Sequence, residues 1–501
     1  MVSDGTITYL VDYLVDKISP SIPPGWGAED KKPVKLSEAQ LQDFFENHIY
    51  LSKSGHFLYS YTGTIWVYNG RNYEMVETDT YLKEVVKQAL KKLDVGLVYQ
   101  KFSPKRIADE CLSSMENRGD GRFVADRRYI VFNNGVFDVE EGVLKEFGMQ
   151  YRTDIILDID YDPNASNALW EEKLVEILPY EDSRRDFQMW CGALLNNRDK
   201  YKMEKVCIIL GPGSNGKSVI TEAITGVFGS KYFRNFQPDQ LLKDNNKMFN
   251  LAALQGCIGN FCGDMKKENI SATGFKSFAS GEEFEARHPF GRVVFKVKAP
   301  MLLCCANEMP PTTDDSWGYH RRLMSIQSTS RIRTEKDADS ELTNKLKTKE
   351  VRTAIFNWIY EGYKMFVANG GKIDLSERTK ALQLELRDDS NSLRRWIRDY
   401  GYVKVVREFS TIDDSWKLIK DWHDEYKQYC KDNGDNQPQN TKSMTRIFRE
   451  KGFLEKRRTD GIWFCIGKLE YPDAINEETT DPFGNPIKRI TSETPEEELP
   501  F

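Results

Sequence analysis

The chain has 501 residues, of which 40% are hydrophobic and 30% are charged, and its formal net charge is −6. This composition is typical of a globular protein and excludes a disordered or fibrous one, while the length predicts three or four domains. The negative net charge excludes a chain that is basic throughout, so any contact with nucleic acid must depend on local basic patches.

The first part of the chain predicts an arm followed by a small domain. Residues 1–35 combine a short amphipathic stretch with several prolines and glycines, and we interpret them as an arm or linker. Residues 36–161 contain segments with the apolar periodicity of helices and segments with that of strands, and they predict an α+β domain. Helices are expected at 37–47, 80–93 and 104–115, and strands at 57–59, 64–67, 129–132 and 135–139.

Two carboxylates, Asp158 and Asp160, lie at the end of this domain. On a strand they would point to one face, which is how primases and polymerases hold two metal ions. No third carboxylate, basic triphosphate site or zinc stem is evident nearby. We therefore interpret the pair as a solvated strand end, and primer synthesis stays an alternative.

A nucleotide-binding core is predicted at residues 203–330, after a helical collar at 162–202. Five apolar residues at 206–210 predict a buried parallel strand. The next eight, Gly-Pro-Gly-Ser-Asn-Gly-Lys-Ser at 211–218, fit G-x-x-x-x-G-K-[ST], and a helical pattern continues at 219–228. This strand–loop–helix context predicts a phosphate-binding loop.

The chemistry of the loop follows from its residue types. Glycines let several N–H groups converge on phosphate oxygens, and the helix N-terminus adds its positive dipole end. Lys217 can reach the β- and γ-phosphates, and Ser218 can ligate Mg2+. The predicted nucleoside triphosphate site comprises Gly211, Pro212, Gly213, Ser214, Asn215, Gly216, Lys217, Ser218 and Val219.

Two polar residues follow later strands of the predicted core. A weakly apolar strand ends in Asp264, and a buried strand at 300–306 ends in Asn307. A carboxylate beside the loop can hold the Mg2+ shell and polarise the attacking water. The amide of Asn307 can orient that water or contact the γ-phosphate.

Basic residues follow in two groups. Lys276, the turn at 280–283 and Arg287 precede a hairpin predicted at 287–298, whose tip would carry His288, Phe290 and Arg292. Aromatic and basic residues together can bind a single-stranded backbone. Arg321 and Arg322 come after a polar loop, where an arginine could enter a neighbour's site and stabilise transition-state charge.

The C-terminal part predicts a helical lid at 331–395, with helices at 335–369 and 376–388, and a winged helix at 396–469. In the winged helix we expect helices at 413–429 and from Asn440 or Thr441 onward, then a hairpin at 453–466. Segment 442–458 carries seven Lys/Arg against two Glu, the local charge that DNA phosphates require. The predicted contacts are Arg446, Arg449, Arg457 and Arg458, and a solvated basic face on a packing domain is the alternative.

The tail at 470–501 is polar and acidic and is predicted to be disordered. Its last residues, Glu-Glu-Glu-Leu-Pro-Phe, resemble the acidic tip of bacterial single-stranded-DNA-binding proteins. That resemblance implies recruitment of a polymerase, a primase or a host replication factor, and a frayed tail is the alternative.

The motifs of the core, taken in order, resemble those of the superfamily 3 helicases of viruses, phages and plasmids, which are ring-forming AAA+ motors. The resemblance rests on the loop at 211–218, Asp264, Lys276 with Ser280-Gly281, Arg287, Asn307 and Arg321-Arg322. Upstream, F-N-N-G-V-F-D at 132–138, Y-D-P at 161–163 and W-C-G-A-L at 190–194 are similar to the phage/plasmid and poxvirus primase-helicase branch.

The resemblance implies a multidomain α/β fold with an AAA+ core between the N-terminal domain, collar, lid and winged helix. It implies that Lys217 and Ser218 bind the phosphates and Mg2+ of ATP, that Asp264 is the Walker B carboxylate, and that Asn307 is sensor 1. Arg322 would be the arginine finger acting in trans, with Arg321 its neighbour, and residues 288–292 the pore hairpin. The family usually has Glu or an acid pair where this chain has Gly263-Asp264, and the residues before the collar are too few for a polymerase-like primase domain.

We therefore expect an ATP-dependent replicative DNA helicase of a phage- or plasmid-type element, acting as a homohexameric ring on single-stranded DNA. The alternatives are a bifunctional primase-helicase and an origin-binding initiator that uses ATP for assembly. Nine scattered cysteines without C-x-x-C spacing indicate reduced thiols, and no membrane span or signal peptide is visible. We expect the protein in the host cytoplasm.

Overall fold

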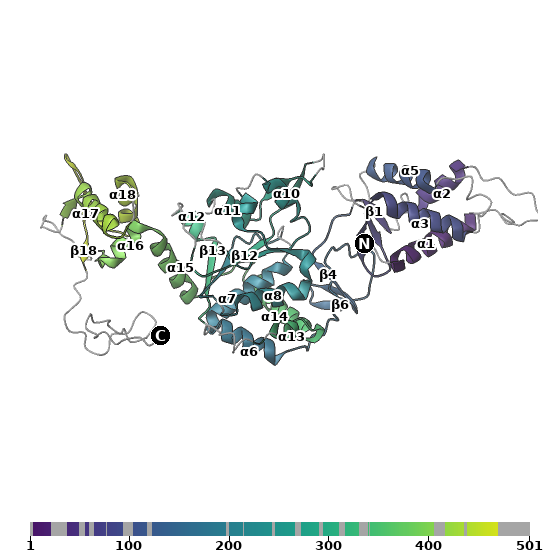
Figure 1. The fold of residues 1–501 in the computed structure, drawn as a ribbon, viewed down its shortest axis with the longest axis horizontal. Coiled ribbons are helices and arrows are strands. Elements are labelled where there is room, and N and C mark those ends of the chain that lie inside the picture. Colours follow the sequence, from purple (N-terminus) through teal and green to yellow (C-terminus); the bar gives the residue numbers. More distant parts are fainter. Residues whose placement is uncertain are drawn as a thin grey trace, which may run out of the picture. The chain divides into compact units, whose positions relative to one another are not determined.

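The computed structural model (Figure 1) has two compact units, Met1–Glu385 and Leu386–Phe501. It describes residues 4–21, 38–49, 56–59, 65–76, 78–93, 104–117, 123–196, 200–213, 215–242, 246–265, 272–289, 294–309, 316–329, 339, 341–404, 416–434 and 438–468. No helix within these ranges combines the length and apolarity that crossing a bilayer needs. All nine cysteines lie in the described part, are buried and form no disulfide.

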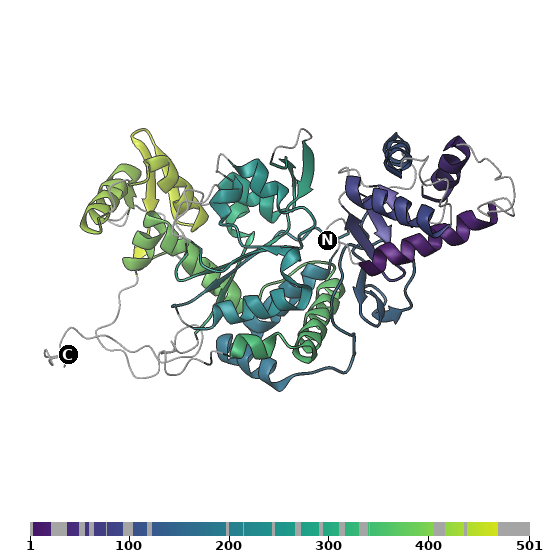
Figure 2. The ribbon, with the colours of Figure 1, turned by 45° about the vertical axis from the view of Figure 1, so that its right-hand side comes forward.

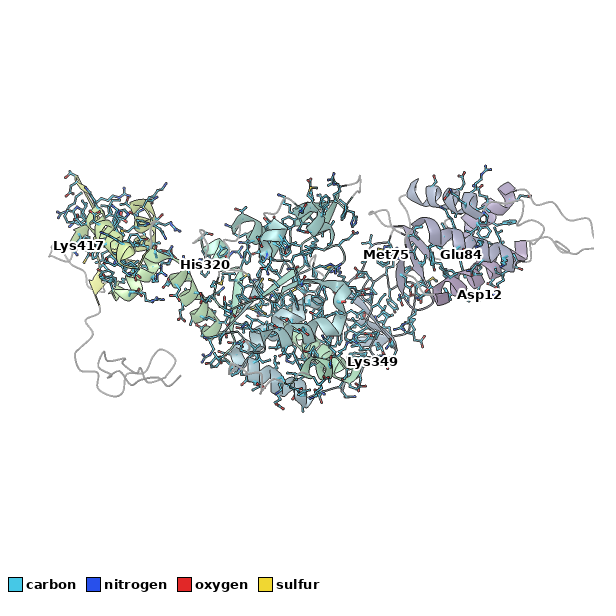
Figure 3. The ribbon with its side chains drawn as sticks, viewed as in Figure 1. Asp12, Met75, Glu84, His320, Lys349 and Lys417 are labelled. Carbon is cyan, nitrogen blue, oxygen red and sulfur yellow. The ribbon has the colours of Figure 1, made fainter. Side chains whose placement is uncertain are left out.

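The N-terminal module has its own hydrophobic core. It contains α1 (Asp4–Ile18), η1 (Ser19–Ser21), α2 (Glu38–Ile49), α3 (Thr78–Lys92) and α5 (Pro104–Asn117), and an antiparallel sheet β1-β2-β3 (Phe57–Tyr59, Ile65–Tyr68, Tyr73–Val76). Leu10, Leu14 and Ile18 of α1 are fully buried in this core, and Asp12, which is labelled in Figure 3, forms an ion pair with Lys92 of α3. Residues 4–18 therefore belong to the module, which corrects the expected arm.

A second small sheet joins the central core instead of the N-terminal module. It is an antiparallel meander of β4 (Tyr129–Phe132), β5 (Gly135–Asp138) and β6 (Val143–Lys145). Phe132 and Phe137 pack edge-on against Phe356, at 4.8 and 5.6 Å between ring centroids. The α+β domain expected at 36–161 thus divides between two cores.

The centre of the first unit is a parallel sheet with the strand order β13-β7-β12-β9-β8. Its strands are β7 (Val206–Leu210), β8 (Phe233–Arg234), β9 (Gly259–Cys262), β12 (Met301–Ala306) and β13 (Leu323–Gln327). β7 and β12 are buried along their whole length, as strands covered on both faces are. All paired neighbours are parallel, so the carboxyl ends of the strands share one edge.

Helices cover both faces of this sheet (Figures 1 and 2). One layer contains α6 (Ala168–Ile177), α7 (Glu181–Gly192), η2 (Ala193–Leu195), α8 (Lys217–Phe228), α13 (Leu342–Leu346) and α14 (Lys349–Ala368). The other contains α9 (Pro238–Leu242), α10 (Lys247–Ala252), α11 (Ala272–Ala279) and α12 (Trp317–His320), and η3 (Ser230–Tyr232) precedes β8. α14 packs along α7 and α8, so the expected lid and collar form one layer.

The second unit begins before the expected boundary at 396. α15 (Glu377–Ser390) crosses the division, and α16 (Ser392–Asp399), α17 (Ile419–Asp432) and α18 (Thr441–Glu450) follow. Sheets β15-β17-β16 (Trp416–Leu418, Gly461–Cys465, Leu454–Arg458) and β14-β18 (Tyr402–Val403, Gly467–Lys468) complete it. Trp396 of α16 is fully buried in its core.

Two expectations within this unit have different outcomes. The start of the helix expected at 413–429 is wrong, because Trp416 lies in strand β15 and the helix α17 begins at Ile419. Asn440 caps α18 as predicted, accepting a hydrogen bond from the Ser443 N–H at 2.9 Å. The tail at 470–501 lies outside the described residues.

Candidate nucleotide-binding site

The predicted phosphate-binding loop connects β7 to α8, which begins at Lys217. Gly216 has φ +87°, and a Cβ there would lie 2.8 Å from the Ile177 side chain. At Gly211 a Cβ would lie 2.4 Å from the carbonyl oxygen of Ser328. The loop therefore favours glycine at both positions. Gly216 is needed for its positive φ, and at both positions a Cβ would lie too close to a neighbouring atom.

The ammonium group of Lys217 lies across this loop. It donates hydrogen bonds to the carbonyl oxygens of Gly211 (2.6 Å) and Pro212 (2.7 Å) and to Oδ1 of Asn215 (2.9 Å). Lys217 is 8% exposed, and burial lowers the pKa of its amine. Phosphate oxygens could replace these acceptors. Ser218 and Val219 follow in the first turn of α8, and Ser214 lies outside the described residues.

Asn215 joins the loop to the rest of the core. Its Nδ2 donates to Ser328 Oγ at 2.9 Å, and Ser328 Oγ donates to the carbonyl oxygen of Ile177 at 3.0 Å. Asn215 is 2% exposed and Ser328 1% exposed. Asn215 was predicted only as part of the loop and Ser328 was not predicted, because the two residues are brought together only by folding.

Asp264 and Asn307 lie at the same edge of the sheet as the loop. Asn307 follows β12 directly, Asp264 follows β9 by two residues, and both residues are exposed. The Met265 N–H donates to the Cys305 carbonyl at 2.8 Å, so the segment after β9 is held against β12. The structure places the loop, Asp264 and Asn307 at the ends of neighbouring strands, because β12 lies between β7 and β9.

Arg321 and Arg322 lie at the other edge of the sheet. Arg322 directly precedes β13, and its carbonyl accepts from the N–H of Val206, the first residue of β7. A five-residue strand separates this edge from the loop, a distance of about 17 Å. The structure therefore does not bring either arginine to the loop of its own chain.

Glu204 contacts both arginines and was missed by the sequence analysis. Its carboxylate pairs with Arg321 at 2.5 Å and with Arg322 at 3.4 Å, and it accepts from Ser280 Oγ at 3.2 Å. Burial opposes ionisation of Glu204, but the hydrogen bond from Arg321 and the charge of Arg322 lower its pKa overall. No local sequence pattern distinguishes a single Glu shortly before a strand, so this role of Glu204 could not be predicted.

The predicted hairpin begins four residues earlier than expected, at Glu283, and ends at Lys298 as expected. Its strands are β10 (Glu283–Ala286) and β11 (Phe295–Lys298), so Arg287 follows the first strand instead of beginning it. The Arg287 guanidinium lies 5.6 Å from the Phe249 ring centroid, and His288 Nε2 lies 3.2 Å from Gln255 Oε1. Lys276 lies on α11. Phe290 and Arg292 lie outside the described residues.

The basic residues predicted to contact DNA lie on α18 and the β16–β17 hairpin. Arg449 makes two hydrogen bonds to Glu455, at 2.6 and 2.8 Å, and Arg457 Nε lies 3.4 Å from the same carboxylate. The Arg458 guanidinium lies 5.2 Å from the Trp463 ring centroid. Arg446 is exposed on α18. Glu455 thus competes with DNA phosphates for Arg449 and Arg457, which are two of the four residues predicted to contact DNA in this unit.

The Asp158 carboxylate is paired with Arg352 of α14, and the Asp160 carbonyl accepts from Thr353 Oγ1 at 3.1 Å. Both aspartates are exposed, as predicted for a solvated segment, but residues 157–160 form no strand and the segment is bonded to α14. Among the described residues no group of three or more His, Cys, Asp or Glu could hold a metal ion.

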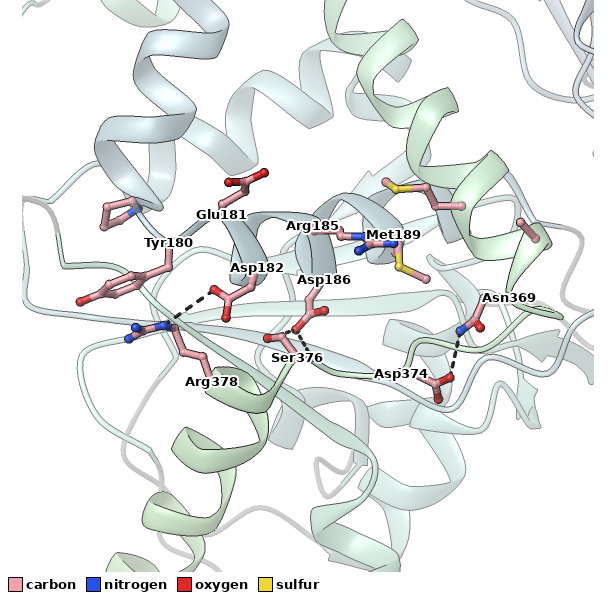
Figure 4. Close-up of a pocket in the computed structure, with 13 residues that line it drawn as sticks. Tyr180, Glu181, Asp182, Arg185, Asp186, Met189, Asn369, Asp374, Ser376 and Arg378 are labelled. Carbon is pink, nitrogen blue, oxygen red and sulfur yellow. Dashed lines mark hydrogen bonds and ion pairs between the residues drawn. The ribbon is translucent and has the colours of Figure 1, made fainter. Parts of the chain in front are cut away.

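A cavity of about 940 Å3 lies between α7 and the segment after α14 (Figure 4). Asp186 accepts from Ser376 N–H (3.0 Å) and Oγ (2.8 Å), and the Arg378 guanidinium stacks 3.7 Å from the Tyr180 ring centroid. These contacts join α7 to the start of α15. This cavity could not be predicted from local sequence patterns, because its walls come from segments that are distant in the chain.

Comparison with known proteins gives matches over two segments. Residues 39–179 match a family model described as D5 N terminal like, and residues 209–322 match a family of unknown function, DUF5906. The second match includes the whole loop at 211–218, Asp264, Asn307 and both arginines.

A curated relative, "Putative helicase L207/L206" of Acanthamoeba polyphaga mimivirus, is 25% identical over 256 residues. The match covers 48% of this chain and 25% of the relative, so the chain spans about a quarter of that protein. Among solved structures, the apo C-terminal region of NrS-1 is 13% identical with a TM-score of 0.45, over 83% of this chain and 99% of that one. A second structure, the A form of that region, is 12% identical with a TM-score of 0.43, over 82% and 96%.

Proposed function

We propose that this chain is an ATP-dependent replicative DNA helicase with an AAA+ core that works as a homohexameric ring on single-stranded DNA. The observation that carries the proposal is the position of Lys217. Its ammonium lies across a loop with the full phosphate-binding pattern, at the sheet edge where Asp264 follows β9 and Asn307 follows β12. Ligands in parallel α/β sheets bind at this edge.

The residues present fit ATP and Mg2+. The loop N–H groups, the α8 N-terminus and Lys217 would bind the β- and γ-phosphates. Ser218 and Asp264 would hold Mg2+, whose preferred ligands are hard oxygen atoms and which would neutralise phosphate charge. Asp264 would also polarise the attacking water while Asn307 orients it. The products are ADP and inorganic phosphate.

Two kinds of similarity support helicase chemistry over the many other uses of such a loop. The chain is D5-like over residues 39–179, and a relative of 25% identity carries the name of a helicase. In the sheet, β12, which Asn307 follows, lies between the loop strand β7 and β9, which Asp264 follows, so both predicted residues flank the strand order that the loop begins.

The second unit supports a role on duplex or forked DNA. Its three helices, the sheet β15-β17-β16 and an exposed basic hairpin are the parts that a winged helix requires. We propose that α18 and this hairpin contact DNA phosphates, and that the acidic tail recruits a polymerase, a primase or a host replication factor in the host cytoplasm.

The deciding experiment compares Lys217→Ala with Lys345→Ala, which removes an exposed lysine from α13. ATP hydrolysis and unwinding of a forked duplex are measured on the full chain. Lys217→Ala should abolish both activities, and Lys345→Ala should change neither. Normal unwinding by Lys217→Ala would refute the proposal that ATP hydrolysis at this loop drives unwinding, and ATP-driven assembly of the wild type on DNA without unwinding would instead favour the origin-binding initiator.

A further inference from the structure

Asp264 would have two tasks at the proposed ATP site, to hold Mg2+ and to polarise the attacking water. The two tasks conflict, because a carboxylate that is bound to a cation becomes a weak proton acceptor. The preceding residue, Gly263, has no side chain that could take over either task. A second carboxylate beside Asp264 would resolve the conflict.

The segment after β8 brings another aspartate, Asp239, to the same edge of the sheet. β8 pairs in parallel with β9, and Arg234 lies opposite Asn260. Asp239 follows Arg234 by five residues, and Asp264 follows Asn260 by four. The two aspartates therefore follow neighbouring strands that run in the same direction, at about the same distance along the chain.

Hydrogen bonds hold this segment against β9. The Asn260 side chain, which is fully buried, donates to the Phe236 carbonyl at 2.8 Å and accepts from the Phe236 N–H at 3.0 Å. The Gln237 side chain donates to the Asp264 carbonyl at 2.7 Å. Residues 236 and 237 are thus bonded to β9 and to the segment that follows it, and Asp239 comes two residues later, in α9.

Asp239 and Asp264 lie near the same sulfur atom. The Cys304 thiol lowers the pKa of the Cys262 thiol by a hydrogen bond, and the negative charges of both aspartates oppose this shift. Asp264 is also close to the loop, because burial lowers the pKa of the Lys217 amine and the charge of Asp264 opposes that effect. This agrees with the strand order β7-β12-β9-β8, which places Asp264 between the loop and Asp239.

The protein neutralises neither of these two carboxylates. Within the ranges that the structure describes, the side chains of Asp239 and Asp264 form no hydrogen bond or ion pair. Asp138, Asp158 and Glu204, by contrast, are each paired with an arginine. Two like charges near one another without a counter-ion are unfavourable, and such an arrangement is typical of sites where a substrate or a cation completes the charge balance.

We propose that Asp239 is a catalytic residue of this ATPase, the carboxylate that accepts a proton from the attacking water, and that Asp264 is left to hold Mg2+. The water oxygen forms a bond to the γ-phosphorus while the bond from that phosphorus to the β–γ bridging oxygen breaks, and the electron pair stays on ADP. One proton of the water passes to Asp239 and then to the inorganic phosphate. This inference rests on the proposed ATP hydrolysis and assigns the polarisation of the water to Asp239 instead of Asp264.

The assignment is tested on the full chain by comparing Asp239→Asn with Asp16→Asn, which changes an aspartate of α1 whose side chain is 73% exposed. Asp239→Asn keeps the shape of the side chain and should lower kcat for ATP by about 10²-fold or more, the contribution of a general base. KM for ATP should stay the same, because Asp239 contacts the water and not the nucleotide. Asp16→Asn should match the wild type, and a wild-type kcat in Asp239→Asn would overturn the proposal.

Metal binding separates the roles of the two aspartates without measuring turnover. Mn2+, which takes the place of Mg2+ and is followed by electron paramagnetic resonance, is titrated in the presence of a non-hydrolysable ATP analogue. Asp239→Asn should bind Mn2+ as the wild type does, whereas Asp264→Asn should bind it about tenfold more weakly or worse, since losing even a partner of a metal ligand costs that much. A loss of Mn2+ affinity in Asp239→Asn would make Asp239 a metal ligand and would overturn its role as the base.

A new carboxylate at position 263 tests the same assignment by recovery of activity. A Cβ at Gly263 would have no described atom within 4 Å, so this position has space for a side chain beside Asp264. In the Asp239→Asn background, Gly263→Asp should raise kcat by about tenfold or more, and Gly263→Asn, which has the same shape but cannot accept the proton, should not raise it. Equal kcat values for these two double variants would refute the need for a second carboxylate.

Failure of the proposed function is distinguishable from failure of this inference. A wild-type chain that does not bind the ATP analogue refutes the nucleotide site and the role of Asp239 with it. A wild-type chain that binds and hydrolyses ATP, together with an Asp239→Asn variant that hydrolyses it equally fast, refutes the role of Asp239 alone.

Discussion

Asn215 and Ser328 are joined by a hydrogen bond of 2.9 Å from Nδ2 to Oγ, although 113 residues separate them. The same Asn215 side chain accepts from Lys217 Nζ, and Ser328 Oγ donates to Ile177 O. The lysine, the loop, the end of β13 and the end of α6 are thus connected by buried polar contacts. Such contacts fix a single geometry when all their members are satisfied.

Asn215→Ala should therefore weaken ATP binding. The substitution removes the acceptor that holds Lys217 and leaves the buried partners of Asn215 unsatisfied. An unsatisfied buried polar group costs about 1–3 kcal/mol. We therefore expect the affinity for ATP to fall by about tenfold. Ser328→Ala should have a smaller effect, because Asn215 keeps its bond to Lys217 and lies 3.4 Å from the Ser328 carbonyl. Fluorescence titration with an ATP analogue measures both, and equal losses would contradict this order.

Asp138, in the F-N-N-G-V-F-D motif, should matter for stability more than for catalysis. Its fully buried carboxylate accepts from Arg128 at 2.9 and 2.7 Å and from Lys145 at 2.7 Å. Asp138→Asn removes the charge of the buried partner that the two cations share and should cost about 2–3 kcal/mol of unfolding free energy. Thermal unfolding measures the loss, and Glu141→Gln, which removes a half-exposed partner of the same cations, should cost under about 1 kcal/mol.

The stabilisation by Asp138 should depend on pH. Burial raises the pKa of this carboxyl, but the hydrogen bonds from Arg128 and Lys145 outweigh that effect and hold its pKa well below the ordinary value of 3.8. A lowered pKa in the folded state means that stability is present above pH 3.8 and is lost as the pH falls toward the lowered value. The melting temperatures of wild type and Asp138→Asn should therefore converge below about pH 4, and a constant difference would contradict this account.

The sequence predicts those features that depend on neighbouring residues. The loop at 211–218, its strand and its helix follow from local periodicity and glycine placement, and Asp264 and Asn307 follow from the ends of apolar runs. The contacts of Asn215 with Ser328 and of Glu204 with Arg321 join residues more than a hundred positions apart. Strand β3 was not predicted, because its four residues stand in the sheet only through pairing with β2. The role of α1 likewise depends on a core assembled from α2, α3 and α5.

Two glycines in helix interiors should respond in opposite ways to alanine. At Gly362 of α14 a Cβ would lie 2.0 Å from the Gln188 carbonyl oxygen of α7, whereas at Gly226 of α8 the nearest atom would be Lys347 Cγ at 3.5 Å. Gly362→Ala must push two helices apart and should destabilise the first unit by about 1–3 kcal/mol or more. Gly226→Ala should stabilise it by about 0.5–1 kcal/mol, because alanine favours a helix interior. Thermal unfolding measures both shifts, and a stabilising Gly362→Ala would contradict the close approach of α7 and α14.

The last prediction concerns Glu455, which binds Arg449 with two hydrogen bonds on the proposed DNA-binding face. Lys456 on the same strand is exposed and has no ion-pair partner in the described part of the chain. Lys456→Ala should weaken DNA binding and lower the slope of log affinity against log salt by about 0.9, the value of one phosphate contact. Glu455→Gln should act in the opposite direction, because it frees Arg449 and removes a negative charge.

The coupling between these two residues decides whether Arg449 contacts DNA. Arg449→Ala should cost more affinity in a Glu455→Gln background than in the wild type, because only there is the guanidinium free to bind phosphate. Fluorescence anisotropy with a forked duplex at several salt concentrations measures all four combinations. Equal costs in both backgrounds would mean that Arg449 serves to hold β16 against α18 and does not contact DNA.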